Sequence, residues 1–189
     1  MHLKKYILVS ICLIASITAY ASDLSDQLKS SSYVLLMRHT SAPGIGDPAN
    51  YTLKDCKTQR NLSPEGREQA VFIGRWLKKQ GVIAAEVHTS DWCRCKDTAQ
   101  LLNFGKFKVE PALASFFDDM SKSKEANTQL QEFISRRLAS KGDKALIMVT
   151  HHVNIVEYAG ENIASGDMVL AKVSPLGELL SYKRIPRPE

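Results

Sequence analysis

Two short runs of apolar residues, each leading into a histidine, constrain the fold of this chain most strongly. The first covers residues 33–38 and leads into His39, and the second covers residues 145–149 and leads through Thr150 into His151 and His152. Continuous apolar runs of this length are typical of strands that are buried on both faces of a parallel sheet. The sequence therefore predicts two buried strands whose carboxyl ends carry histidines.

Helical patterns alternate with strand patterns along the rest of the chain. Ser63 is placed to cap a helix that Pro64 opens, and an apolar stripe carries this helix to a stop at Gly81. A second helix is expected to start at Ser90 or Asp91. The remaining expected elements are a strand within 82–88, a short segment at 107–109, helices over 122–140 and 153–160, and strands over 168–173 and 179–183. This alternation predicts one α/β domain, a three-layer α/β/α sandwich with a mostly parallel central sheet.

The amino terminus has the pattern of a secretory signal peptide. Lys4 and Lys5 precede an apolar stretch that is too short to span a bilayer comfortably, and Ala19-Tyr20-Ala21 fits a cleavage site. We therefore expect a signal peptide over 1–21, a mature domain over 22–189 and a periplasmic or secreted protein without a stable membrane anchor. The alternatives are a buried N-terminal helix or an uncleaved anchor.

The charge of the chain argues against nucleic acid as a partner. The formal net charge is +5, and it falls to +3 once Lys4 and Lys5 are removed with the signal. No block of lysines and arginines is long enough to indicate a nucleic-acid surface. A mild positive excess instead favours the approach of anionic small molecules. The sequence does not indicate an oligomeric state.

Arginines and histidines are expected to meet at one edge of the sheet. His39 and His151 each follow an apolar strand, Arg38 precedes His39, and Arg94 lies at the start of the helix after a third strand. In open α/β sheets, ligands bind at the carboxyl ends of the strands. A single histidine there would most often do no more than contact its neighbours. The convergence of four such side chains with backbone N–H groups of helix N-termini predicts a cationic pocket for a tetrahedral dianion.

Four segments carry a resemblance to a known family. Residues 36–40 are similar to a strand followed by Arg-His-Gly, with Thr40 in place of the glycine, and residues 61–70 are similar to a Leu-Thr-x-x-Gly-x-x-Gln-Ala helix start. Residues 89–99 are similar to a Ser-x-x-x-Arg-x-x-x-Thr-Ala helix, and Val149-Thr150-His151 matches a second histidine motif. In this order the motifs resemble the histidine phosphatase superfamily, which includes the phosphoglycerate mutases, over about residues 32–156.

The resemblance implies a phosphomonoesterase that acts on a small-molecule phosphate ester or another phosphorylated substrate. It implies that His39 attacks phosphorus and forms a covalent phosphohistidine. Arg38 and Arg94 would bind the non-bridging oxygens, and His151, if protonated, would add a further donor. These residues fill every charge-stabilising role, so we expect no metal and no other cofactor.

The leaving group also needs a proton donor. Family members supply a carboxylate between the third strand and the second histidine, and Ser115 occupies the place of the glutamate found in mutase-type members. Asp118 lies closest to the family spacing, and Asp119 and Glu125 are the alternatives. The sequence leaves open whether His152 lines the pocket or points away.

Cysteine use fits an exported protein. Cys12 lies in the predicted signal, which leaves Cys56, Cys93 and Cys95 in the mature chain. An oxidising compartment favours one disulfide and one spare thiol. Cys93 and Cys95 are too close to pair easily at a helix start, so we expect Cys56 to pair with one of them.

Two other functions are compatible with the same residues. One is a non-catalytic module that binds phosphate or a phosphorylated ligand and has kept the pocket without the acid. The other is a zinc site of His39, His151 and His152, which needs a further ligand because adjacent histidines cannot easily both face one ion.

Overall fold

The computed structural model describes residues 24–189, so the predicted signal peptide over 1–21 lies outside the described residues. Within this range every helix is too short or too polar to span a bilayer. The strands are β1 (Tyr33–Arg38), β2 (Ala85–Thr89), β3 (Phe107–Val109), β4 (Ala145–Thr150), β5 (Met168–Val173) and β6 (Leu179–Ile185). The helices are α2 (Pro64–Lys79), α3 (Cys93–Leu101), α4 (Ser123–Leu138) and α5 (His152–Ala159), with short 3₁₀ helices at Cys56–Thr58, Pro111–Leu113 and Met120–Lys122.

The strands form one six-stranded sheet in the order β3-β2-β4-β1-β5-β6. The pairs among β1 to β4 are parallel, as expected for buried strands joined by helices. β5 runs antiparallel to β1, and β6 antiparallel to β5. A tight turn over residues 174–178 joins these last two strands, and Gly177 adopts a φ of 80° there. The sheet is therefore mostly parallel, with an antiparallel hairpin at one edge.

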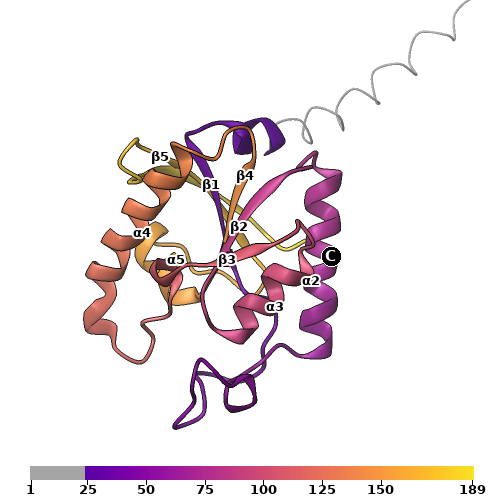
Figure 1. Ribbon diagram of the computed structural model, residues 1–189, viewed down its shortest axis with the longest axis vertical. Coiled ribbons are helices and arrows are strands. Elements are labelled where there is room, and N and C mark those ends of the chain that lie inside the picture. Colours follow the sequence, from indigo (N-terminus) through magenta and orange to yellow (C-terminus); the bar gives the residue numbers. More distant parts are fainter. Residues whose placement is uncertain (1–23) are drawn as a thin grey trace, which may run out of the picture.

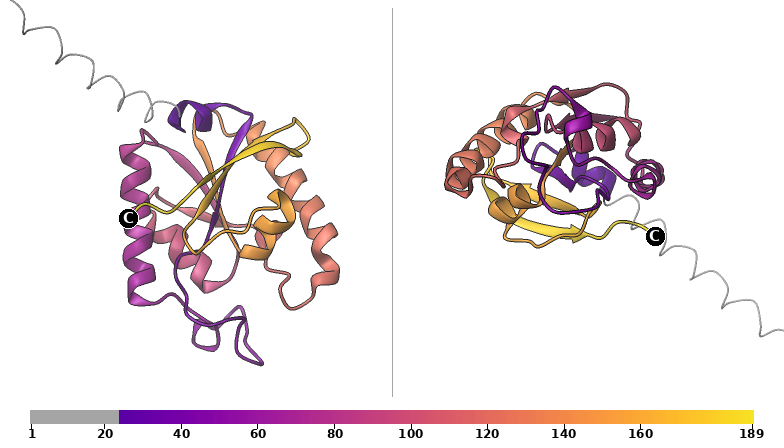
Figure 2. Two further views of the ribbon diagram at one scale, coloured as in Figure 1. Left: turned by 180° about the vertical axis from the view of Figure 1, so that it is seen from behind. Right: turned by 90° about the horizontal axis from the view of Figure 1, so that it is seen from below.

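Helices cover both faces of the sheet, which makes the three layers predicted from the sequence (Figures 1 and 2). Successive strand residues point to opposite faces, so Leu35 and Met37 pack in the core beneath α2 and α3. Val34 and Leu36 pack in the second core, beneath α4 and α5. All four side chains are fully buried, which explains why the β1 sequence is apolar at consecutive positions.

The ends of α2 follow the sequence signals. The Ser63 side chain accepts a hydrogen bond from the Gly66 amide, Pro64 opens the helix, and Gly81 has the left-handed φ of 83° that ends it. A Cβ on Gly66 would lie 2.0 Å from the Ser41 carbonyl oxygen, so only glycine fits there. This close approach fixes the chain just after His39.

The start of α3 differs from the prediction. The N-cap position is Trp92, and no side chain caps the helix. The Ser90 hydroxyl instead contacts His151, and the Asp91 carboxylate pairs with Lys96. Both predicted capping groups are therefore used for other contacts, and α3 begins at Cys93, later than expected.

Candidate active site

Strand register brings the two histidines together at the carboxyl edge of the sheet. Arg38 of β1 lies opposite Thr150 of β4, and the His39 amide donates to the Thr150 carbonyl over 3.0 Å. The next residue of each strand is thus a histidine, and the two ring centroids lie 5.7 Å apart. Ser90, which follows β2, donates its amide to Val149 and so places the start of α3 at the same edge.

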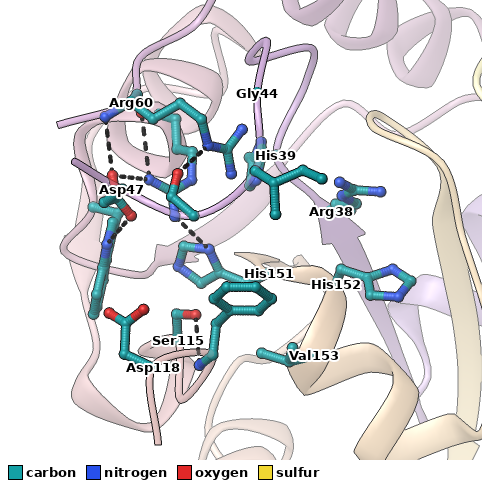
Figure 3. A pocket seen from close by; sticks show the side chains of 15 residues that line it. Arg38, His39, Gly44, Asp47, Arg60, Ser115, Asp118, His151, His152 and Val153 are labelled. Carbon is teal, nitrogen blue, oxygen red and sulfur yellow. Dashed lines mark hydrogen bonds and ion pairs between the residues drawn. The ribbon is translucent and has the colours of Figure 1, made fainter. Parts of the chain in front are cut away.

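A cavity of about 250 Å³ opens at this edge (Figure 3). The residues predicted from the sequence that line it are Arg38, His39, Arg94, Asp118, His151 and His152. Asp119 and Glu125 are not among the lining residues: Asp119 caps the 3₁₀ helix over Met120–Lys122, and Glu125 accepts a hydrogen bond from Gln129. In Figure 3, Asp47 and Asp118 lie on one side of the cavity, and Arg38 and His152 on the other.

His39 is held as a neutral imidazole with a defined tautomer. Its Nδ1 lies 2.8 Å from the Thr40 carbonyl oxygen, which can only accept, so Nδ1 carries the proton. Burial lowers the pKa of His39 to about 3, more than the hydrogen bond to Thr40 raises it, and the charges of Arg94, Arg38 and Arg60 lower it further. The unprotonated Nε2 is therefore a nucleophile throughout the neutral range.

His151 is also neutral here, and it would supply the further donor considered from the sequence only if it were protonated. Its Nδ1 lies 3.4 Å from Nη2 of Arg94, which can only donate, and its Nε2 lies 2.7 Å from the Ser90 hydroxyl. Burial lowers the pKa of His151 well below its usual value, and the neighbouring His39 and arginines lower it further. Protonation would require an anion in the pocket to offset these effects.

Arg94 is anchored by a carboxylate that the sequence analysis did not identify. Asp47 Oδ1 accepts from Arg94 Nη1 over 2.9 Å, and both side chains are almost completely buried. Asp47 Oδ1 also accepts from the Arg60 amide, and Oδ2 accepts from the Trp92 indole over 3.1 Å. Three donors on one buried carboxylate fix the position of Asp47 and of the Arg94 guanidinium.

A third arginine lines the cavity beside the two predicted ones. Arg60 donates from Nε to the Gly46 carbonyl over 2.6 Å and from Nη1 to the Ala42 carbonyl. Burial lowers the pKa of Arg60, as does the charge of Arg94. Arg38 donates from Nη1 to the Ile163 carbonyl over 2.9 Å. Within the described part of the chain, residues 24–189, the buried Nε atoms of Arg38 and Arg94 have no hydrogen-bond partner, and an oxyanion could supply one.

The two departures from the family motifs have different outcomes. The Thr40 hydroxyl lies 3.1 Å from the Thr98 hydroxyl, and the Thr40 amide donates to the same atom, so Thr40 ties β1 to α3 and is not a lining residue of the cavity. His152 does line the cavity, and its Nδ1 lies 3.3 Å from the Ile163 carbonyl that also accepts from Arg38.

The long loop after β1, residues 41–61, is tied to the start of α3. A disulfide joins Cys56 to Cys93, one of the two partners expected, and Cys95 is a free, buried thiol. The Gln59 side chain accepts from the Cys93 amide over 2.9 Å. Burial raises the pKa of Cys95 to about 12, so this thiol stays protonated beside His151.

Asp118 occupies the exposed rim of the cavity. Its Oδ2 accepts a hydrogen bond of 3.0 Å from the Tyr51 hydroxyl, which belongs to the long loop. Ser115, at the position of the mutase glutamate, also lines the cavity, and its hydroxyl accepts from the Phe117 amide. Of the three carboxylates considered from the sequence, Asp118 is the one that lines the cavity, and it is also the one closest to the family spacing.

Asp47, Arg60 and Trp92 are among the lining residues that sequence reasoning missed, and their side chains hold or contact the predicted site residues. Asp47 and Arg60 lie in the irregular loop, where no periodicity marks a buried position. Asp47 is identified by its buried ion pair with Arg94, and this contact becomes visible only in the folded structure.

A zinc site of His39, His151 and His152 has no support from geometry. Among residues 24–189, no group of three or more His, Cys, Asp or Glu side chains is arranged to hold a metal ion. The Nδ1 atoms of His39 and His152 face backbone carbonyls.

Comparisons with known proteins identify the family of the chain. The profile of the histidine phosphatase superfamily (branch 1) matches residues 34–146. A search of curated protein sequences gave no match.

Solved structures with the same fold include the protein histidine phosphatase SixA complexed with tungstate, with a TM-score of 0.56 and 18% identity over 82% of this chain and 97% of that one. A mycobacterial glucosyl-3-phosphoglycerate phosphatase has a TM-score of 0.57 and 12% identity, with coverage of 84% and 99%. A phosphoserine phosphatase from Entamoeba histolytica has a TM-score of 0.55 and 12% identity, with coverage of 79% and 95%. The chain belongs to the histidine phosphatase superfamily, branch 1, and is a phosphoric monoester hydrolase of the histidine phosphatase type.

Proposed function

We propose that the protein is an exported phosphatase that hydrolyses phosphate monoesters of small molecules through a covalent phosphohistidine on His39, without a metal ion. The observation that carries the proposal is the state of His39. Its imidazole is neutral, Nδ1 is blocked by the Thr40 carbonyl, and the ring lines a cavity shared with Arg38, Arg60 and Arg94.

The reaction takes place in two displacements at phosphorus. Nε2 of His39 forms a bond to phosphorus as the ester P–O bond breaks, and the arginines stabilise the charge on the non-bridging oxygens. Asp118 gives its proton to the departing oxygen and becomes a carboxylate. Water then attacks the phosphohistidine, Asp118 takes a proton from that water, the P–N bond breaks and inorganic phosphate leaves.

The two carboxylates of the cavity suit different roles. Asp47 is buried and accepts from three donors, so it has no free oxygen to carry a proton. Asp118 is exposed at the rim, where a leaving group would depart, and among residues 24–189 its one side-chain hydrogen bond is to Oδ2, which leaves Oδ1 available. A module that only binds phosphate would have no use for an acid at this place.

Two features support export. The disulfide between Cys56 and Cys93 is the kind of bond that persists in an oxidising compartment, and the amino-terminal sequence has the signal pattern described above. If the signal is cleaved as proposed, N-terminal sequencing of protein recovered from the periplasm should begin at Ser22.

The mechanism is tested by trapping the intermediate in the presence of EDTA. Purified mature protein is mixed with ³²P-labelled substrate, denatured rapidly without acid and mapped by proteolysis. We expect an acid-labile, alkali-stable label on His39, and His39→Ala should abolish both the label and turnover of p-nitrophenyl phosphate. Label on a serine, threonine or aspartate, or a requirement for zinc after EDTA, would overturn the proposal.

A further inference from the structure

The proposed acid at the rim is held by a residue of the long loop after β1. Tyr51 belongs to the loop 41–61, and its hydroxyl donates to Asp118 Oδ2 over 3.0 Å. This is the only side-chain hydrogen bond of Asp118 within residues 24–189. Two segments that are distant in sequence thus meet through one hydroxyl and one carboxylate.

Tyr51 is itself fixed by contacts with the rest of the site. Its ring lies 6.1 Å from the Trp92 ring at 44°, and Trp92 contacts both Asp47, through its indole N–H, and His151, over 5.2 Å between ring centroids. The Tyr51 amide closes a turn by donating to the Pro48 carbonyl. The disulfide from Cys56 to Cys93 anchors the same loop one residue from Trp92.

The hydroxyl remains a donor over the whole working range of pH. Burial raises the pKa of Tyr51 to about 12, as do the hydrogen bond and charge of Asp118 and the charge of Asp47, while Arg94 lowers it. A tyrosine that does not ionise donates to Asp118 Oδ2 whether the carboxyl group is charged or protonated. Oδ1 is then the oxygen that carries the transferable proton.

We propose that Tyr51 is a positioning residue for the general acid: its hydroxyl holds Oδ2 of Asp118 so that Oδ1 presents the proton to the leaving group. The inference rests on the proposed role of Asp118. It predicts that Tyr51 matters most for esters whose leaving group departs poorly, because only those need the proton at the moment of bond cleavage.

The test compares an alkyl phosphate with p-nitrophenyl phosphate, whose leaving group departs with little help. In Tyr51→Phe, which keeps the ring against Trp92, the ratio of kcat/KM for the alkyl ester to that for the p-nitrophenyl ester should fall about tenfold, a part of the ~10²–10⁴-fold that a general acid supplies. The basic limb of the pH profile, which loss of the proton from the general acid would set, should also move to higher pH, because the carboxylate has lost a hydrogen-bond donor.

Tyr182→Phe is the matched control, because the Tyr182 hydroxyl donates to the Glu161 carboxylate over 2.8 Å and neither residue lines the cavity. It should change neither the ratio nor the pH profile. In an Asp118→Asn background, Tyr51→Phe should cause no further change in the ratio, since the two residues act as one unit.

The outcomes separate the inference from the proposed function beneath it. Suppose that Asp118→Asn lowers the ratio, but Tyr51→Phe lowers kcat/KM equally for both esters and does not move the basic limb. The proposed role of Tyr51 is then wrong, and the proposed role of Asp118 as the acid is retained. If Asp118→Asn leaves the ratio unchanged, Asp118 is not the acid, and the proposed roles of Asp118 and of Tyr51 are both wrong. Thermal unfolding of each variant shows whether a loss of activity reflects a loss of fold.

Discussion

The disulfide gives the sharpest prediction about stability. Cys56 and Cys93 are separated by 37 residues, and the entropy of closing a loop of this length in the unfolded chain corresponds to about 4 kcal/mol at 25 °C. Replacing exposed Cys56 with Ser and buried Cys93 with Ala removes the cross-link with a suitable residue at each position. Urea unfolding of this double variant should therefore show a loss of about 4 kcal/mol in the free energy of unfolding.

Activity should respond much less than stability. The disulfide acts mainly on the unfolded state, whereas in the folded state Gln59 still binds the Cys93 amide and Asp47 still binds Arg94 and Trp92. Well below the melting temperature we expect kcat/KM of the double variant to stay within about threefold of the parent, a difference of under ~1 kcal/mol. A collapse of kcat/KM in a folded variant would show that the disulfide alone places the loop.

Reduction of the parent protein supplies the control. Dithiothreitol should lower the stability of the parent to that of the double variant and should leave the double variant unchanged. Buried Cys95 is present in both proteins and does not distinguish them. A stability loss below about 1 kcal/mol in the double variant would refute the loop-entropy reasoning for this site.

Two further predictions concern the buried charges. Because the folded state lowers the pKa of His39 from 6.5 to about 3, the unfolded chain binds more protons, and stability is present above pH 6.5 and lost as pH falls toward 3. Between pH 6.5 and about 3, the free energy of unfolding should fall by about 1.4 kcal/mol for each unit by which the pH is lowered, for each such histidine. Urea unfolding at a series of pH values should therefore show a shallower dependence of this free energy on pH in His39→Ala than in the parent. An unchanged pH dependence would contradict a neutral His39. Asp47→Ala leaves the buried Arg94 without its partner and should destabilise the protein by about 3–5 kcal/mol. Part of this loss should be recovered on adding inorganic phosphate, measured by unfolding with and without the anion, and a loss that phosphate does not affect would argue against an anion site at Arg94.

The regular part of the fold could be predicted from the sequence because its signals are local. The strand over 33–38 and the cap at Ser63 appear in the structure as expected, since apolar patterning and capping chemistry act over a few residues. The parallel register of β1 and β4 then makes the proximity of His39 and His151 a consequence of topology.

The irregular part of the site could not be predicted in the same way. Asp47, Arg60 and Tyr51 lie in a loop whose path depends on contacts with α3 and with the rim. The protonation state of His151 depends on burial, which the sequence does not show: it contains the two histidines and two arginines but not the packing that favours a neutral imidazole beside them.

The charge balance of the cavity explains why a buried carboxylate accompanies a third arginine. Arg38, Arg60 and Arg94 carry three positive charges, Asp47 removes one, and the histidines are neutral, so the inner site has a net charge of +2. This charge equals in magnitude the two negative charges of a phosphoryl dianion. Without Asp47 the repulsion among the three arginines would be uncompensated, and the Arg94 guanidinium would lose the carboxylate that it contacts. Asp47 therefore orients Arg94 and at the same time offsets part of the repulsion among the three arginines.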